Sequence, residues 1–342
     1  MSSIDWAASI SKLNNGLDLE PLEAQGLMRE VLEDRSDKET LKEFLLALKA
    51  KGETPEEVGA LVEQMYSQCA PINIAERSVD TVGTGGDGAH TINISTTAAI
   101  IAAAAGSRVV KHGNRAASSQ CGTADVLEAL GVRIDLDPAD VARCVVEAGM
   151  GFCFAQKFHP AFRHAGPTRK EIGVPTAFNL LGPMANPANV SFMVVGVGDP
   201  RAAEKMARAI ASRGVERAWI VHGHGGLDEL SLSGPCSVVE VRDNALSEFT
   251  INAVDLGLQP ADVTAVRGGD PAHNAQVVLD TFNGQLGPVR DIVVLNAAAG
   301  LTVAGVASSM EEGMSLAQAS IDNGSAIRVV EALKVSSNAV AR

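Results

Sequence analysis

The sequence predicts an α/β protein with a small all-helical unit at its N-terminus and a larger unit built on a central, mostly parallel sheet. Three observations lead to this prediction. The first 71 residues carry amphipathic helical patterns and no strand pattern. From Ser78 onward, short β-rich runs alternate with helical segments, as in parallel sheets covered by helices. Aromatic residues make up only 4% of the 342 residues, so the core must be mostly aliphatic.

Local signals mark three helices in the N-terminal unit. Ser36–Glu39 has the pattern of a capping box, followed by an apolar face between Leu41 and Leu48. Thr54 before Pro55 and two acidic residues is typical of a second helix start, and Pro21 predicts a third. The outer apolar surface of such a unit is suited to a dimer contact.

The larger unit begins with a strand near Val79. We predict strands at 79–82, 108–111, 151–155, 192–197 and 219–221, helices at 95–105, 123–130 and 200–213, a late hairpin formed by 238–241 and 248–251, and an Ala-rich helical segment from Arg290 onward.

The stretch from His159 to Pro187 interrupts this alternation. It is dense in Pro and Gly and carries a helical pattern at 176–181. Such a stretch can cross back to the helical unit, which would make that unit discontinuous in sequence.

Charge and cysteine usage narrow the functional classes. With 28 Lys and Arg against 41 Asp and Glu, the formal charge is -13, which argues against binding to nucleic acid or an anionic membrane. A small anionic ligand needs only a local concentration of donors. The five cysteines are scattered and show no CxxC spacing, which favours reduced thiols and gives no zinc site.

The sequence contains neither a signal-peptide pattern nor a membrane-spanning one. The N-terminus lacks a basic segment followed by an apolar one, and the most apolar run, Ala98–Ala105, is too short to cross a bilayer. We therefore expect a cytoplasmic protein without a membrane partner.

A glycine-rich loop follows the first strand. Asp80–Gly88 reads DTVGTGGDG, so backbone N–H groups can converge on an anion. It matches neither a Walker A loop nor GxGxxG at the required spacing. Thr91–Thr96 then supplies hydroxyls and amides at a helix N-terminus, which attracts phosphate. An ordinary glycine-rich turn capped by Ser95 explains these residues equally well.

A second polar loop, Lys111–Ser119, also follows a strand. Its cations, hydroxyls and amide suit a phosphorylated, polyhydroxylated ligand. Arg115 could bind the phosphate through two N–H groups, and Lys111 through its single point charge. A solvated basic loop is the alternative. Because both loops follow parallel strands, they are expected to open at the same edge of the sheet, where α/β proteins bind ligands.

The run Gly226–Leu230 (GLDEL) places two carboxylates side by side. In isolation, a solvated turn is the better interpretation, but beside two phosphate-type loops Asp228 and Glu229 are plausible Mg²⁺ ligands. His222 and His224 have no neighbouring carboxylate or cysteine of the kind that a metal site needs, and we interpret them as structural. Arg169 is the one isolated basic residue that we place in a pocket, although a surface role is the default for any single Arg.

These segments together resemble the anthranilate phosphoribosyltransferase family of tryptophan biosynthesis. GTGGD, NIST, KHGNRAASS, the His159–Pro187 stretch with FNLLGP and NP, and GLDEL stand in the family's order and spacing, over essentially the whole chain. GTGGD is shared with related nucleoside phosphorylases. The resemblance implies transfer of the phosphoribosyl group of 5-phosphoribosyl 1-diphosphate (PRPP) to the amine of anthranilate, which yields N-(5-phosphoribosyl)anthranilate and diphosphate.

The resemblance also implies an architecture. It is a homodimer of the class III phosphoribosyltransferase fold, in which a hinge joins two domains. The helical domain would comprise 1–75 with roughly 168–187, and the α/β domain 76–167 with 188–342. PRPP would bind the α/β domain with two Mg²⁺ ions, and anthranilate would bind the cleft between the domains.

The family pattern assigns site residues by position. For PRPP, it implies Gly83, Gly86, Asp87, Thr91, Asn93, Ile94, Ser95, Thr96, Lys111, Asn114, Arg115, Ser118, Ser119 and Thr123. For anthranilate it implies Gly83, His112, Asn114 and Arg169, of which His112, Asn114 and Arg169 form the catalytic group. For the metal it implies Ser95, Asp228 and Glu229. The chain departs from the family at Gln156 and Phe162, which we expect to border the outer anthranilate channel.

Two rival functions are weaker. A pyrimidine nucleoside phosphorylase of the same fold would carry a lysine-histidine-serine phosphate motif, which is absent at Asp80–Gly88. A non-catalytic paralogue that binds nucleic acid would carry a basic face and dispense with the metal carboxylates. The net charge and the Asp228–Glu229 pair both count against it.

Overall fold

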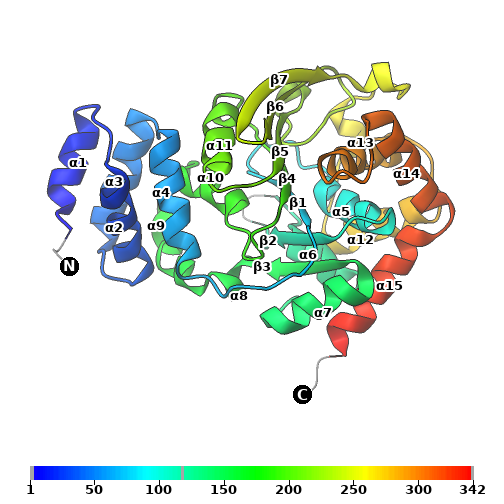
Figure 1. Ribbon diagram of the computed structural model, residues 1–342, viewed down its shortest axis with the longest axis horizontal. Coiled ribbons are helices and arrows are strands. Elements are labelled where there is room, and N and C mark those ends of the chain that lie inside the picture. Colours follow the sequence, from blue (N-terminus) through cyan, green and yellow to red (C-terminus); the bar gives the residue numbers. More distant parts are fainter. Residues whose placement is uncertain (1–3, 117–118, 340–342) are drawn as a thin grey trace.

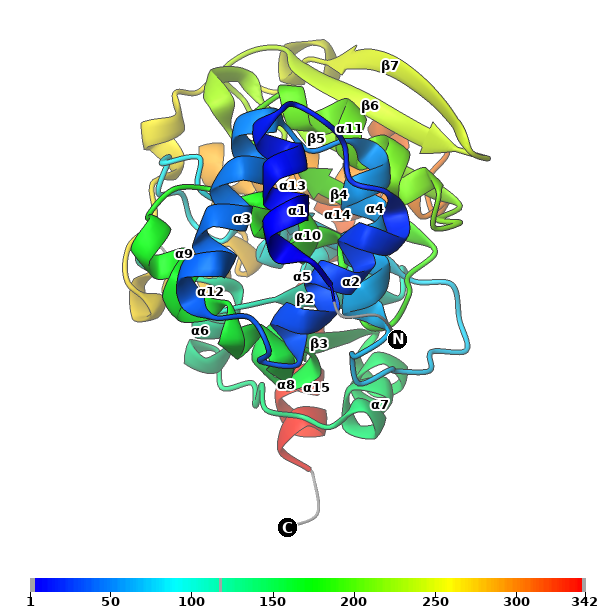
Figure 2. The same ribbon diagram turned by 90° about the vertical axis from the view of Figure 1, so that its left-hand side faces the viewer.

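The computed structural model describes residues 4–116 and 119–339. Four helices form one end of the molecule, and a larger part built on a sheet forms the rest (Figure 1). The four helices stand side by side in the view from that end (Figure 2). They are α1 (Trp6–Asn14), α2 (Pro21–Leu32), α3 (Lys38–Lys51) and α4 (Pro55–Tyr66).

Caps explain where two of these helices begin. The capping box predicted at Ser36–Glu39 is wrong: Asp37 is the N-cap of α3, and its Oδ1 accepts a hydrogen bond from the backbone N–H of Thr40 at 2.9 Å. Asp caps as well as Ser does, and here it lies next to the first helical residue. At α4 the predicted cap is confirmed, because Thr54 and Glu57 exchange two side-chain to backbone hydrogen bonds.

A seven-stranded sheet forms the centre of the larger part. Its spatial order is β3-β2-β1-β4-β5-β6-β7, and the first five strands in this order are parallel. The antiparallel hairpin β6–β7 completes it. The predicted fold class is confirmed. The strands are β1 (Val79–Gly83), β2 (Val109–Gly113), β3 (Met150–Phe154), β4 (Phe192–Gly196), β5 (Arg217–His222), β6 (Cys236–Arg242) and β7 (Ala245–Ile251).

Helices surround this sheet (Figure 1). They are α5 (Ile94–Ala104), α6 (Thr123–Ala129), α7 (Pro138–Ala148), α11 (Arg201–Ala211), α12 (Pro271–Phe282), α13 (Pro288–Val303), α14 (Met310–Asp322) and α15 (Ser325–Asn338). Two of them, α7 and α12, have no counterpart among the predicted elements. Each begins with an Asp–Pro pair, which is a helix-start signal.

The segment between β3 and β4 packs against the N-terminal helices. It forms α8 (Ala155–Phe158), a 3₁₀ turn at Pro160–His164, α9 (Gly166–Ile172) and α10 (Ala177–Met184). Helix α9 packs on α3, and α10 packs on α3 and α4. Glu171 of α9 forms ion pairs with Lys38 and Lys42 of α3, the second at 2.6 Å.

The strand order places a crevice near the middle of the sheet. The chain runs from β1 outward to β2 and β3, and then returns to β4 on the other side of β1. Parallel sheets bind ligands beyond the carboxyl ends of the strands at such a reversal. No helix in residues 4–116 and 119–339 is long and apolar enough to cross a membrane.

Candidate active site

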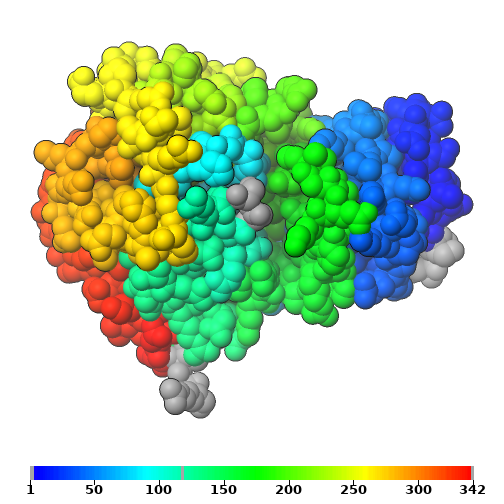
Figure 3. Space-filling view, turned by 180° about the vertical axis from the view of Figure 1, so that it is seen from behind, coloured from blue at the N-terminus to red at the C-terminus, as the bar shows by residue number. Residues whose placement is uncertain are grey.

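A cavity of about 350 Å³ opens at this carboxyl edge. The loops after β1, β2 and β5 and the first residues of α5 form its walls. On this face, the space-filling view shows a hollow between the loop regions of the larger part and the segment of α9 and α10 (Figure 3). Among the predicted site residues, the lining holds Gly83, Gly86, Asp87, Thr91, Asn93, Ser95, Lys111, His112, Asn114, Arg115, Ser119, Thr123, Asp228 and Glu229.

Three of the described predicted residues do not line this cavity, and a fourth residue is not described. Ile94 and Thr96 are fully buried, and the Thr96 hydroxyl lies 3.2 Å from that of Thr123. Arg169 comes from α9, outside the lining. Ser118 lies outside the described residues.

Three carboxylates meet on one side of the cavity. Oxygen atoms of Asp87, Asp228 and Glu229 all lie within 4.8 Å of one another. Asp228 and Glu229 follow β5, whereas Asp87 ends the glycine loop after β1. The sequence pattern assigned Asp87 to the diphosphate loop and not to the metal ligands, because only the folded loop brings it to the other two acids.

The glycine loop approaches Asp228 closely. Asp228 Oδ2 accepts a hydrogen bond from the backbone N–H of Gly85 at 2.7 Å. A Cβ atom at Gly83 would lie only 2.3 Å from the same oxygen. A side chain at this position would therefore displace the Asp228 carboxylate or the loop.

Burial and the neighbouring negative charges raise the pKa values of two acids in this cluster. Burial, and then Asp87, raise the pKa of Asp228 to about 6. Burial, and then Asp228 and Asp87, raise the pKa of Glu229 well above its usual value. Three clustered carboxylates beside a loop of backbone N–H groups fit a divalent cation such as Mg²⁺, which takes carboxylate ligands together with phosphate oxygens. The Ser95 backbone N–H donates to Glu229 at 3.2 Å, and Ser95 lines the same cavity.

Lys111 lies beneath the cavity as a buried cation. Its Nζ donates to the backbone carbonyl of Thr81 and lies 3.4 Å from the Ser95 hydroxyl. Burial lowers the pKa of Lys111, while Asp80, Glu229 and Asp228 act in the opposite direction. The Lys111 ammonium is therefore held by Thr81 and Ser95, within electrostatic reach of Asp80 and the carboxylate cluster.

Arg115 is engaged by acidic residues of α6. Its guanidinium donates to Asp125 at 2.9 Å and to Glu128 at 3.0 Å. The hydrogen bonds that it donates to Glu128 and Asp125 raise the pKa of Arg115. To grip a phosphate, this exposed side chain would have to exchange one of these partners.

His112 borders a wall of aromatic rings. Burial is the main cause that lowers the pKa of His112 to about 3, so the imidazole is neutral at pH 7. Its Nε2 is buried and has no hydrogen-bond partner among the described residues. The ring packs edge-on against His159, which stacks on Phe162, which in turn meets Phe178 edge-on.

Arg169 closes this aromatic wall. Its guanidinium carbon lies 5.1 Å from the centre of the Phe178 ring. Burial lowers the pKa of Arg169, and no residue in the described part of the chain forms an ion pair or hydrogen bond with its guanidinium. A half-buried, unpaired cation next to aromatic rings suits an aromatic carboxylate.

Gln156, where the chain departs from the family, contacts a predicted site residue. Its side-chain N–H donates to Asn114 Oδ1 at 3.3 Å, and the same oxygen accepts the backbone N–H of Arg115 at 2.8 Å. The second departure, Phe162, belongs to the aromatic wall.

Asn179 of α10 lines the cavity, although the sequence patterns assign it no role. It also lines a neighbouring cavity of about 580 Å³ on the other side of the glycine loop. The sequence signal that could have identified Asn179 was its place within the FNLLGP motif. The packing of α10 across from the glycine loop, which brings it to the site, involves residues far apart in the chain.

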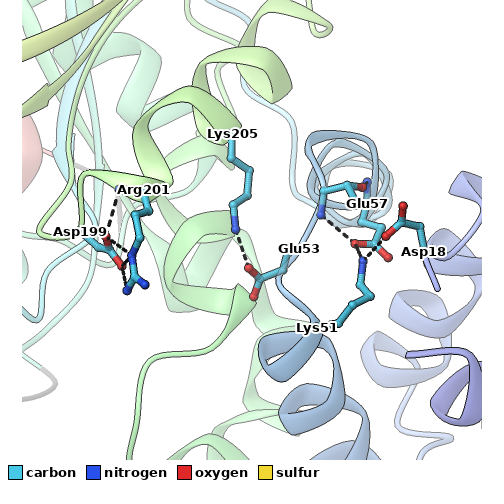
Figure 4. A network of polar contacts seen from close by, with 8 residues as sticks. Asp18, Lys51, Glu53, Glu57, Asp199, Arg201 and Lys205 are labelled. Atoms are coloured by element: carbon cyan, nitrogen blue, oxygen red, sulfur yellow. Dashed lines mark hydrogen bonds and ion pairs between the residues drawn. The ribbon is translucent and has the colours of Figure 1, made fainter. Parts of the chain in front are cut away.

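An ion pair borders the neighbouring cavity. Lys205 of α11 and Glu53, just after α3, lie 2.7 Å apart and are both largely buried (Figure 4). Lys51 and Glu57 form a second buried pair nearby, at 2.7 Å. The first of these contacts ties the N-terminal helices to the sheet-containing part beside the glycine loop.

Comparisons with known proteins agree with this geometry. A family model described as the helical bundle domain of a glycosyl transferase family matches residues 8–69, and the a/b domain model of that family matches residues 75–327. Anthranilate phosphoribosyltransferase of Roseiflexus sp. (strain RS-1) is 48% identical over 95% of this chain and 96% of its own length. The chain belongs to the anthranilate phosphoribosyltransferase family.

Other members of the family support this assignment. The protein of the same name from Thermomicrobium roseum is 47% identical over 97% of both chains. The crystal structure of the Thermus thermophilus member superposes with a TM-score of 0.92 at 40% identity, covering 97% of this chain and 99% of that one. The family prediction and the prediction of a pentosyl-transferring enzyme are thus confirmed.

One solved structure of the family contains ligands. The Saccharomyces cerevisiae member in complex with PRPP and Mg superposes with a TM-score of 0.90 at 25% identity, over 99% of both chains.

Proposed function

We propose that this chain transfers the phosphoribosyl group of PRPP to the amine of anthranilate, in tryptophan biosynthesis. The observation that carries the proposal is the meeting of Asp87, Asp228 and Glu229 at the glycine loop within one cavity. Family membership supplies the two substrates, since the relatives are named for this transfer.

The reaction breaks the bond between C1 of the ribose and the diphosphate oxygen, and forms a bond between C1 and the anthranilate nitrogen. One amine proton passes to solvent. Charge separates on the way, because the sugar carbon becomes cation-like while diphosphate gains negative charge. Preorganised donors aimed at the leaving group therefore lower the barrier. In this chain, N–H groups of the glycine loop would supply them, apart from those of Thr84 and Gly85, which donate to the Gly196 carbonyl and to Asp228.

The metal site would be formed by Asp228, Glu229 and the Ser95 hydroxyl, with Asp87 as a further carboxylate. Mg²⁺ bound there with PRPP would neutralise the diphosphate oxygens. We propose two ions. Support comes from the carboxylate cluster and from the yeast relative, whose structure is a complex with PRPP and Mg.

The phosphoribosyl part would lie on the α5 N-terminus and the loop after β2. Its ligands would be Thr91, Asn93, Ile94, Ser95, Thr96, Lys111, Asn114, Arg115, Ser118, Ser119 and Thr123. Thr96 would act through its backbone N–H group, since its side chain is buried. The side chain of Ile94 is buried as well, and its N–H would have to exchange the Ile92 carbonyl, to which it donates at 2.8 Å, for a phosphate oxygen. Arg115 would exchange Asp125 or Glu128 for a phosphate oxygen.

Anthranilate would lie between Arg169, His112, Asn114 and Gly83. Arg169 would pair with the ring carboxylate, and the aromatic wall would cover one side of the ring. An aryl amine is already neutral at pH 7, so it needs orientation more than deprotonation. A neutral His112 with a low pKa is suited to that role and not to taking up a proton.

The wider organisation is part of the proposal. Residues 1–75 with roughly 168–187 would move as one helical domain on a hinge, and closure would align the amine and exclude water. We propose that the chain acts as a homodimer in the cytoplasm. Five cysteines without a disulfide fit a reducing compartment.

The test is to mix the protein with Mg²⁺, PRPP and anthranilate and to follow the change in anthranilate fluorescence. Benzoate, which lacks the amine, serves as the control acceptor. We expect product only with anthranilate, and calorimetric binding of PRPP only when Mg²⁺ is present. Binding of PRPP without any transfer would contradict the proposed acceptor, and a lack of PRPP binding would contradict the whole proposal.

A further inference from the structure

Asn186 is a buried asparagine at the point where the chain passes from α10 to β4. Its side chain is 1% exposed. The amide donates to Asp80 Oδ2 at 2.8 Å and to the Val110 carbonyl at 2.7 Å, and its Oδ1 accepts the Ala188 N–H at 2.9 Å. Both N–H groups of the Asn186 amide and its oxygen atom are thus used. The two N–H groups join residues 185–191, which we call the crossing segment, to the neighbouring strands β1 and β2.

The backbone of the same residue contacts the helical unit. The hydroxyl of Tyr66, the last residue of α4, donates to the Asn186 carbonyl. Arg213 lies over the Tyr66 ring at 3.9 Å and donates to the Met184 carbonyl. Close by, the Ile72 N–H donates to the Pro187 carbonyl at 3.3 Å. The two segments that join the N-terminal helices and α10 to the sheet therefore meet at Asn186.

The crossing segment contacts two residues, Asp80 and His159, that each contact His112. Asp80, which is fully buried and receives the Asn186 amide, accepts the backbone N–H of His112 at 3.3 Å. The preceding residue, Ala185, contacts His159 Nε2 through its carbonyl at 2.7 Å, and the His159 ring packs against that of His112 at 5.3 Å. The crossing segment is thereby linked to His112, near the end of β2, through Asp80 and His159.

We propose that Asn186 is a positioning residue: by joining the crossing between α10 and β4 to Asp80 and Val110, it sets the position of α10, with Asn179, relative to the end of β2, with His112 and Asn114. This inference rests on the proposed function. The anthranilate side of the site takes Phe178 of the aromatic wall from α10 and His112 and Asn114 from β2 and its loop, whereas the carboxylate cluster and glycine loop lie on the sheet-containing part alone. Loss of Asn186 therefore disturbs the acceptor and leaves PRPP binding intact.

The primary variant is Asn186→Ala, compared with Leu333→Ala, which opens a cavity under a buried leucine of α15 remote from the site. Because a misplacement of about 1 Å costs up to roughly 10²-fold in rate, we expect kcat to fall about tenfold or more. The KM for anthranilate should rise several-fold, and the calorimetric Kd for PRPP with Mg²⁺ should change less than about twofold. Leu333→Ala should lower the melting temperature alone.

Two milder variants keep the test independent of folding. Tyr66→Phe removes the hydroxyl and keeps the ring under Arg213, and Asp80→Asn keeps the shape and removes the charge. Tyr66→Phe should show the same split between anthranilate and PRPP at a smaller size, whereas Asp80→Asn should also weaken PRPP binding, because Asp80 acts on the charge of Lys111. If Asp80 and Asn186 act through one contact, the double variant Asp80→Asn/Asn186→Ala should lose little more activity than the worse single variant.

Hydrogen exchange gives a readout that does not depend on turnover. In Asn186→Ala, the amides of Ala70 and Ile72, which donate to the carbonyls of Phe158 and Pro187, should exchange faster while those of the central strands stay protected. Kinetics that follow stability alone, as in Leu333→Ala, would overturn the inference. Absence of transfer by the unaltered protein would instead count against the proposed function, and exchange at Ala70 and Ile72 would still report on the junction.

Discussion

The missing side chain at Gly83 decides how closely the glycine loop approaches Asp228. Gly83→Ala would place a Cβ 2.3 Å from Asp228 Oδ2, so the carboxylate or the loop must move. We expect kcat/KM for PRPP to fall by roughly 10²-fold or more, since a shift of about 1 Å is enough for that. Gly59→Ala, inside α4 with its nearest atom at 3.6 Å, is the control and should stay close to normal. Equal kinetics for the two variants would contradict the assignment.

His112 is the other residue whose role its surroundings decide. With a pKa of about 3, its imidazole is neutral from pH 5 to pH 8 and does not change charge there. His112→Ala should therefore lose roughly tenfold or less, below the 10²–10⁴ of true acid–base catalysts. The pH profiles of kcat for variant and parent should run parallel. A limb near pH 6.5 that vanishes in the variant would restore a general base at this position.

At the scale of elements, α9 carries Arg169 to the acceptor side. The ion pairs of Glu171 with Lys38 and Lys42 hold this helix on α3, and they lower the pKa of Glu171 to about 2. A lowered carboxyl pKa means that this contribution to stability is present above the unfolded value of 4.5 and is lost as the pH falls toward 2. Since the group is exposed, the effect is small. The attachment of α9 therefore persists at neutral pH.

Arg169→Ala tests what α9 contributes to binding. The lost charge should raise the KM for anthranilate by roughly 10-fold or more, because charge-assisted pairs to a carboxylate are the strong ones. The Kd for PRPP should stay unchanged, and Lys170→Ala, the exposed neighbour, serves as the control. If PRPP binding weakens instead, Arg169 belongs to the other substrate.

At the scale of the whole molecule, the site is a place where the fold carries unfavourable charge. Burial, and after it the repulsion between the acids, raises the pKa values of Asp228 and Glu229, so folding brings these carboxyl groups together at a cost. Asp228→Asn with Glu229→Gln keeps the oxygen atoms that accept the N–H groups of Gly85 and Ser95 and removes the charge.

We expect this double variant to melt about 2 °C or more above the parent when no ligand is present. It should also lose PRPP turnover by orders of magnitude. Adding Mg²⁺ and PRPP should raise the melting temperature of the parent and not that of the variant. Differential scanning calorimetry with and without these ligands measures both effects. A variant that ligands still stabilise would show that the cation is held elsewhere.

Much of this architecture can be predicted from local sequence. The glycine loop and the loop at Lys111 each follow a buried strand, and parallel strands end at one edge, so the sequence places both loops in one site. Thr54 starts α4, and the alternation after Ser78 predicts the sheet. Asp37 shows the limit, because two neighbouring capping residues compete and local pattern does not rank them.

What the sequence determined by itself is therefore the fold class, the order of its elements and the loops that carry chemistry, because helix caps, side-chain periodicity and glycine conformation act over a few neighbouring residues. Only the tertiary structure decided that Asp87 joins Asp228 and Glu229, that Arg115 faces α6, and that Asn186 meets Asp80. The Gly85–Asp228 and Asn186–Asp80 hydrogen bonds span 143 and 106 residues of chain. Such contacts form because buried polar groups must find partners, and the packing of whole elements determines which ones they find.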